Sequence, residues 1–113
     1  GRDAALVRER EGERLLECIA GGDTVVVCDE RGAAWTSQKL ADFLGARRTS
    51  GAGGRVVFVV GGAEGLSDAV RARADVVLAL SAMTLSHELA RVVLLEQIYR
   101  ALSILHGHPY HRA

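Results

Sequence analysis

Apolar residues along this chain recur alternately at helical spacing and in short uninterrupted runs. Residues 3–20 are charged at most positions but carry Leu15, Leu16 and Ile19 on one side, which predicts a surface helix that ends at the glycine pair that follows. Short apolar runs are instead typical of strands. The two patterns predict helices at 3–20, 36–45, 67–74 and 85–105, and strands at 24–28, 56–60 and 76–80.

Turn and capping residues set the limits of these elements. A turn at residues 29–32 closes the first strand. Thr36 or Ser37 can cap the second helix, which we expect to end at Gly45. The three glycines among residues 47–54 predict a flexible surface loop.

The alternation of strands and helices predicts an α/β fold. Parallel neighbouring strands need a crossover, so we expect a parallel sheet with helices on both of its faces. The uninterrupted apolar strand at 56–60 is typical of a strand buried on both sides, and Ser67 can cap the short helix after it. No repeat, low-complexity segment or linker divides the chain, so we expect a single domain over residues 1–113.

Composition narrows the class of protein. The chain has 113 residues, 49% of them hydrophobic and 25% charged, which predicts one soluble domain with a modest core that a partner subunit would help to stabilise. Its 14 basic and 14 acidic side chains cancel, which neither favours nor excludes a polyanionic partner. Cys18 and Cys28 form no disulfide or metal pattern and fit a reducing cytoplasm. No apolar run reaches the roughly 20 residues that a membrane helix needs, so we expect no association with a membrane.

Three segments leave strands at the edge of the sheet where open α/β folds bind ligands. They are Cys28 with Asp29, Gly61 with Gly62, and residues 81–84. Because the carboxyl ends of parallel strands lie together, these segments are candidates to line one pocket.

The two glycines allow the backbone to approach a flat ligand such as adenine, although they also fit a plain strand-to-helix turn. The local sequence GGAEG lacks the GxGxxG and GK[ST] patterns of dinucleotide and triphosphate loops. Residues 81–84 supply hydroxyls, small side chains and a thioether, which suits a loop around a small molecule. Alternatively, Thr84 or Ser86 caps the last helix.

The last helix is apolar nearly all round, so it must be buried on more than one side, against its own sheet and against a partner chain. Its Arg91, Glu96, Gln97 and Arg100 form either a solvated stripe or a ligand or subunit junction. The tail histidines lack companions at zinc-ligand spacing, so we expect no metal. Tyr110 and His111 suit contact with a nucleobase, or a tail packed on the surface.

Several motifs together resemble one known family. They are GGAEGL at 61–66, LSAMT at 80–84, His87, ARV at 90–92, EQIYRA at 96–101 and HPYH at 108–111. In this order they are similar to the ribosomal RNA large subunit methyltransferase H family, which belongs to the SPOUT class. The resemblance covers essentially the whole chain, including Asp29 to Gly32.

The resemblance implies a fold and an activity. Members have a SPOUT-type sheet with a C-terminal trefoil knot and form homodimers whose active sites lie at the interface. They transfer a methyl group from S-adenosylmethionine to N3 of a pseudouridine in 23S ribosomal RNA, which we expect within the assembled ribosome. Members usually begin with a further strand and helix that this chain lacks, so we expect an N-terminally shortened domain.

The resemblance also implies site residues. Cofactor-binding positions correspond to Cys28, where the family often has leucine, and to Gly61, Leu80, Ser81, Ala82, Met83, Thr84 and Leu85. We expect His87 or His111 to assist proton removal or hold the base, and Tyr110 and Arg91 to orient the nucleotide; for His87, a capped helix-start histidine is the alternative. A non-catalytic RNA-binding module and a dimerisation domain are the alternative functions, and the polar segment at 80–84 argues against both.

Overall fold

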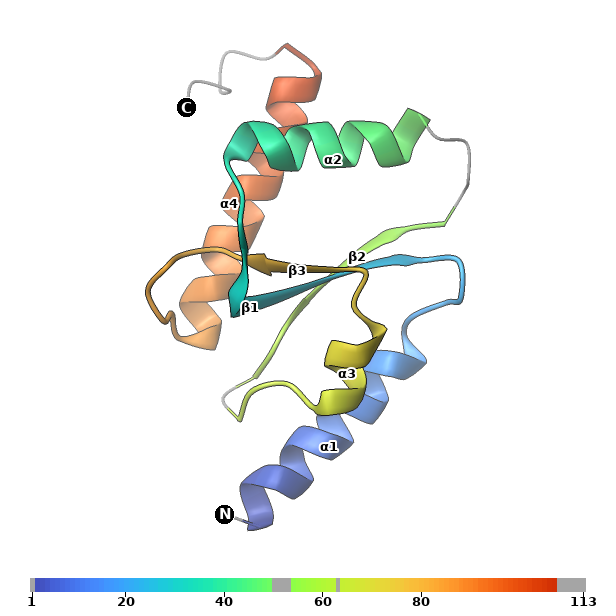
Figure 1. Ribbon diagram of the computed structural model, residues 1–113, viewed down its shortest axis with the longest axis vertical. Coiled ribbons are helices and arrows are strands. Elements are labelled where there is room, and N and C mark those ends of the chain that lie inside the picture. Colours follow the sequence, from blue (N-terminus) through green and yellow to red (C-terminus); the bar gives the residue numbers. More distant parts are fainter. Residues whose placement is uncertain (1, 50–53, 63, 108–113) are drawn as a thin grey trace.

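The computed structural model describes residues 2–49, 54–62 and 64–107 (Figure 1). Within these ranges, no helix is long and apolar enough to cross a membrane. The elements occur in the predicted order. They are α1 (Arg2–Glu17), β1 (Thr24–Ala34), α2 (Ser37–Thr49), β2 (Val56–Val60), α3 (Asp68–Arg73), β3 (Val76–Ala79) and α4 (His87–Leu105).

The described strands form a three-stranded parallel sheet in the order β2-β1-β3. Val26 at the centre of β1 lies opposite Phe58 of β2 on one side and Val76 of β3 on the other. The predicted α/β class with a parallel sheet is therefore confirmed.

Helices cover both faces of the sheet, as predicted (Figure 1). On one face, α1 and α3 pack over Val25 and Val27 of β1 and Val59 of β2. On the other, α2 and α4 form a smaller cluster around Ala101, which Phe58 of β2 joins. Alternate residues of the strands thus supply two separate cores, as the period of a pleated strand requires.

The predicted turn at residues 29–32 is wrong, because β1 continues in extended conformation to Ala34. Its pairing with β3 breaks after Cys28 and resumes at Ala33. A Cβ atom on Gly32 would lie 2.5 Å from the Val77 carbonyl oxygen. The glycine therefore serves a close approach of two strands and not a chain reversal.

The predicted end of the second helix at Gly45 is also wrong, since α2 runs on to Thr49. A Cβ atom at Gly45 would lie 2.9 Å from Cδ2 of Leu105 in α4. Glycine is needed here for close packing of two helices. Residues 47–49, which we expected in a loop, therefore belong to α2, and residues 50–53 of the expected loop lie outside the described residues.

The first helix is shorter than predicted and ends at Glu17. Beyond it, the backbone N–H of Ala20 donates to the Asp23 carboxylate instead of continuing the helix. Burial of β2 is also lower than predicted, because only Val59 is fully buried. Among the described strands β2 has a neighbour on one side alone, which makes it an edge strand.

Hydroxyl groups cap three helices. Thr36 accepts from the Lys39 N–H at the start of α2, and Ser67 accepts from the Val70 N–H at the start of α3, as predicted. At the start of α4 the cap is Ser86, and the helix begins two residues later than predicted.

Candidate functional site

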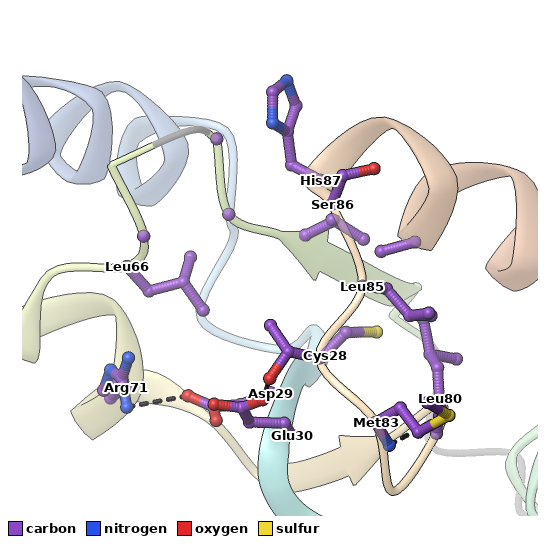
Figure 2. Close-up of a pocket in the computed structure, with 17 residues that line it drawn as sticks. Cys28, Asp29, Glu30, Leu66, Arg71, Leu80, Met83, Leu85, Ser86 and His87 are labelled. Carbon is purple, nitrogen blue, oxygen red and sulfur yellow. Dashed lines mark hydrogen bonds and ion pairs between the residues drawn. The ribbon is translucent and has the colours of Figure 1, made fainter.

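A cavity of about 430 Å³ opens where the three parallel strands end (Figure 2). Its volume is within the range of about 300–1,000 Å³ that is typical of small-molecule sites. Four segments that are distant in sequence line it. They contribute Cys28, Asp29 and Glu30; Val60, Gly61, Gly62, Gly65 and Leu66; Arg71; and Leu80, Ser81, Met83, Thr84, Leu85, Ser86, His87 and Ala90.

The structure brings together most of the residues that the sequence singled out. Of the positions expected to bind a cofactor, all but Ala82 line the cavity, and so does His87. Arg91 does not line it. Tyr110 and His111 lie outside the described residues. The predicted convergence of the three segments is therefore seen, although Cys28 and Asp29 lie within β1 and not at its end. The roles of the individual residues remain predictions.

A tight glycine turn forms one wall. The Gly65 N–H donates to the Gly62 carbonyl at 3.0 Å, and Gly65 has a φ of +83°, which favours glycine. A Cβ atom on Gly61 would lie 2.9 Å from Cγ of Leu66. The close packing of backbone on Leu66 leaves no room for a side chain at Gly61.

The segment between β3 and α4 forms the opposite wall (Figure 2). The Ser81 hydroxyl accepts from the Met83 N–H at 3.0 Å, which folds the segment back on itself. The Thr84 hydroxyl donates to the carboxylate of Glu30 and ties the segment to β1. Met83 is 76% exposed, so its thioether is available to a bound molecule.

Charged groups lie beside the cavity where the pairing of β1 with β3 breaks, and of these the sequence pointed only to Asp29. The Asp29 side chain is only 9% exposed, and its Oδ2 lies 2.7 Å from Nη1 of Arg71 in α3. Arg31 approaches the same carboxylate at 3.4 Å. The Asp29-Glu30 pair at a strand end could have signalled an acidic site, whereas nothing in the local sequence around Arg71 indicates its partner.

Cys28 contributes an apolar surface to the cavity. Burial raises the pKa of its thiol to about 11, because the thiolate is poorly solvated there. The side chain is therefore a neutral thiol at physiological pH. A neutral, half-buried thiol can be replaced by an aliphatic side chain at low cost.

His87 and Arg91 lie at the edge of this site. His87 begins α4 at the rim, and its ring points away from Cys28 and Met83 (Figure 2). Its Nε2 atom lies 3.9 Å from a carboxylate oxygen of Glu88, which is an ion pair only when the imidazole is protonated. Arg91 is exposed on α4, and within the described ranges we find no hydrogen bond or ion pair for it.

The other polar residues of α4 connect it to α2 and to one another. The Ser37 hydroxyl donates to the side-chain Oε1 of Gln97, and the side-chain Nε2 of Gln97 donates to the Glu96 carboxylate at 2.7 Å. Arg100 lies 3.0 Å from the same Glu96 side chain. Glu96, Gln97 and Arg100 thus form an intramolecular network, and their place in a solvated stripe or at a ligand or subunit junction stays a prediction.

One face of α4 exposes an apolar stripe. Its members are Leu89, Val92, Leu95, Tyr99 and Leu102, each between 41% and 65% exposed. They follow helical spacing, so they lie along a single line on the helix surface.

No group of three or more metal-ligating side chains occurs in the part of the chain that the structure describes.

Comparison with known proteins gives one consistent result. The model of a family described as "Predicted SPOUT methyltransferase" matches residues 1–111. Proteins named ribosomal RNA large subunit methyltransferase H are similar to the chain: that of Chromobacterium violaceum is 58% identical over 90% of this chain and 64% of its own length. Those of Geobacter sp. (strain M21) and Nitrosospira multiformis are 50% and 46% identical over 98% and 100% of this chain, and each is covered over 71% of its length. The chain thus spans about two thirds of the length of these relatives.

Proposed function

The chain belongs to the SPOUT methyltransferase family, and we propose that it transfers the methyl group of S-adenosylmethionine to N3 of a pseudouridine in 23S ribosomal RNA. The methyltransferases named above, which act on ribosomal RNA of the large subunit, support this substrate class. The observation that carries the proposal is the cavity where a glycine turn and a hydroxyl-rich segment converge at the ends of parallel strands.

The residues around the cavity fit the proposed cofactor. Gly61 and Gly62 offer backbone without side chains to a flat adenine ring, and Leu80 and Leu85 offer apolar contacts. Asp29 and Glu30 supply carboxylates for the positively charged part of the cofactor. Leu80 to Leu85, together with Cys28 and Gly61, are therefore the residues that we propose to hold it.

When bound, S-adenosylmethionine supplies an electrophilic methyl group on its sulfonium. The protein then has two tasks, which are to align N3 with that methyl group and to accept the N3 proton. We assign proton removal, or the holding of the base, to His87 or His111. Arg91 and Tyr110 are proposed to orient the nucleotide.

A second copy of the chain is part of the proposal. The apolar stripe of α4 exposes five large apolar side chains that a partner chain would cover, and Arg91 lies on the same helix but outside the cavity of its own chain. If two copies pack through this stripe, Arg91 can reach the site of the partner subunit. We also propose, from family membership, that the C-terminal part of the chain forms a trefoil knot.

The first test is a calorimetric titration of the purified chain with S-adenosylmethionine, after sedimentation has given its oligomeric state. Saturable binding to a dimer is expected. Absence of binding by a folded dimer would count against the proposal for this chain. Repeating the titration on a chain extended at its N-terminus to the length of the relatives would then separate a missing segment from a wrong assignment.

The second test is methyl transfer from labelled cofactor to free 23S RNA and to assembled ribosomes that lack the modification. Transfer is expected to the ribosomes. The variants His87→Ala and His111→Ala are compared with the unaltered chain, and cofactor binding is measured for each. If both variants keep full transfer, neither histidine is the base.

A further inference from the structure

The glycine turn beside the cavity is attached to α1, on the side opposite to the proposed cofactor. A Glu11 carboxylate oxygen (Oε1) accepts a hydrogen bond from the Gly62 N–H at 3.1 Å. A Cβ atom on Gly62 would lie 2.8 Å from that same oxygen. A side chain at Gly62 would therefore have to displace the carboxylate of Glu11.

Two further contacts join α1 to the same segment. The Arg8 guanidinium donates to the Glu64 carbonyl oxygen at 2.8 Å. One helical turn further along, a Cβ atom on Gly12 would lie 2.3 Å from the hydroxyl oxygen of Ser67, the residue that caps α3. Arg8 and Glu11 thus contact the turn itself, and Gly12 lies against the residue that follows it, all on one face of α1.

The turn gains from such support because it is rich in glycine. The Gly65 N–H bonds to the Gly62 carbonyl, and glycine backbone has more conformational freedom than that of any other residue. An anionic acceptor on a backbone N–H makes a stronger hydrogen bond than a neutral one. Glu11 therefore fixes the glycine whose other side lines the cavity.

We propose that Glu11, assisted by Arg8, is a positioning residue that holds the glycine turn (Gly61, Gly62 and Gly65) in the shape that binds the cofactor. This inference rests on the proposed function. It assigns to α1, which contributes no lining residue to the cavity, a role in cofactor affinity. Neither residue touches the reacting atoms.

The test measures the dissociation constant for S-adenosylmethionine by calorimetry in a small set of variants of the full chain. Glu11→Ala should weaken binding about tenfold, which corresponds to the loss of one charge-assisted hydrogen bond. Glu11→Gln keeps an oxygen acceptor in place and should restore most of the affinity. Glu13→Ala, at an exposed position of the same helix, is the matched control and should bind like the unaltered chain.

A double-mutant cycle tests the pairing itself. Gly62→Ala places a methyl group against the Glu11 carboxylate and should displace it, so this variant should also bind more weakly. Because either change breaks the same contact, Glu11→Ala and Gly62→Ala should not add when they are combined. Full additivity would overturn the proposal, as would normal affinity in Glu11→Ala or an equal loss in Glu13→Ala.

Amide hydrogen exchange without cofactor keeps this inference separate from the proposed function. In the free protein, the Gly62 amide should exchange faster in Glu11→Ala than in Glu11→Gln, while the central amides of β1 stay protected. If the unaltered chain binds no S-adenosylmethionine, the proposed function is wrong. If the Gly62 amide exchanges at an unchanged rate in Glu11→Ala, the attachment of the turn to α1 is wrong. If Glu11→Ala does not fold, Arg8→Ala tests the same attachment and should give a smaller loss of affinity.

Discussion

Arg71 of α3 lies 2.7 Å from Asp29, which follows the break in the pairing of β1 with β3, and this ion pair closes one side of the cavity (Figure 2). The Asp29 side chain is almost fully buried, whereas Arg71 is about one-third exposed. A buried carboxylate without a partner is costly, so the ion pair helps to hold α3 against β1.

Replacement of Arg71 by alanine should lower the free energy of unfolding by about 1–2 kcal/mol, since it leaves a mostly buried carboxylate poorly compensated. Arg31 also contacts Asp29 but is 70% exposed, so Arg31→Ala should cost no more than about 0.5 kcal/mol. Urea denaturation of the two variants measures the difference. Equal losses would show that Arg71 has no special role.

Elements defined by local patterns were predictable from the sequence. β2 has the predicted bounds, and α3 follows its predicted cap Ser67, because an apolar run and a capping hydroxyl act within a few residues. The glycines were less informative. Gly32 and Gly45 look like turn and termination signals, but each makes room for a distant segment, which a local pattern does not reveal.

The same distinction holds for the site. The general rule for parallel sheets was sufficient to bring Cys28, Gly61 and the segment after β3 to one cavity. The contacts of Arg71 with Asp29, and of Glu11 with Gly62, join residues on separate elements. Side-chain pairs of this kind depend on how helices pack on the sheet, so the sequence alone did not predict them.

Stability should fall at acid pH partly through Asp23. This buried carboxylate has a pKa well below its usual value, first because the Arg55 guanidinium donates to it and also because the Ala20 N–H does. A lowered folded-state pKa contributes stability above the unfolded value of about 3.9, and this contribution is lost as the pH falls towards the folded value. In Asp23→Asn, the thermal midpoint should therefore be lower at pH 7 and should change less below about pH 4.

The control for this measurement is Glu9→Gln, at an exposed position of α1. It should keep the pH dependence of the unaltered chain. If Asp23→Asn loses stability on acidification as steeply as the unaltered chain does, other carboxylates govern the acid transition.

Cys28 should react with iodoacetamide far more slowly than Cys18. Cys18 is exposed, whereas burial raises the pKa of Cys28 to about 11 and keeps it in the unreactive thiol form at pH 8. Mass spectrometry of the folded chain should show labelling at Cys18 about tenfold faster or more, and urea should equalise the two rates. Comparable rates in the folded chain would mean that the cavity is open at Cys28.

The apolar stripe of α4 predicts that one substitution can abolish dimerisation and leave cofactor binding intact. Leu95, near its centre, is 65% exposed in the single chain, and Leu95→Glu would place a charge in the proposed interface. Sedimentation should show a monomer that still binds S-adenosylmethionine, because the cavity forms within a single chain. Methyl transfer should be lost if Arg91 acts in the site of the partner subunit. Leu6→Glu, at a 46% exposed position of α1, is the control and should stay dimeric and active, whereas a dimeric Leu95→Glu would exclude this face as the interface.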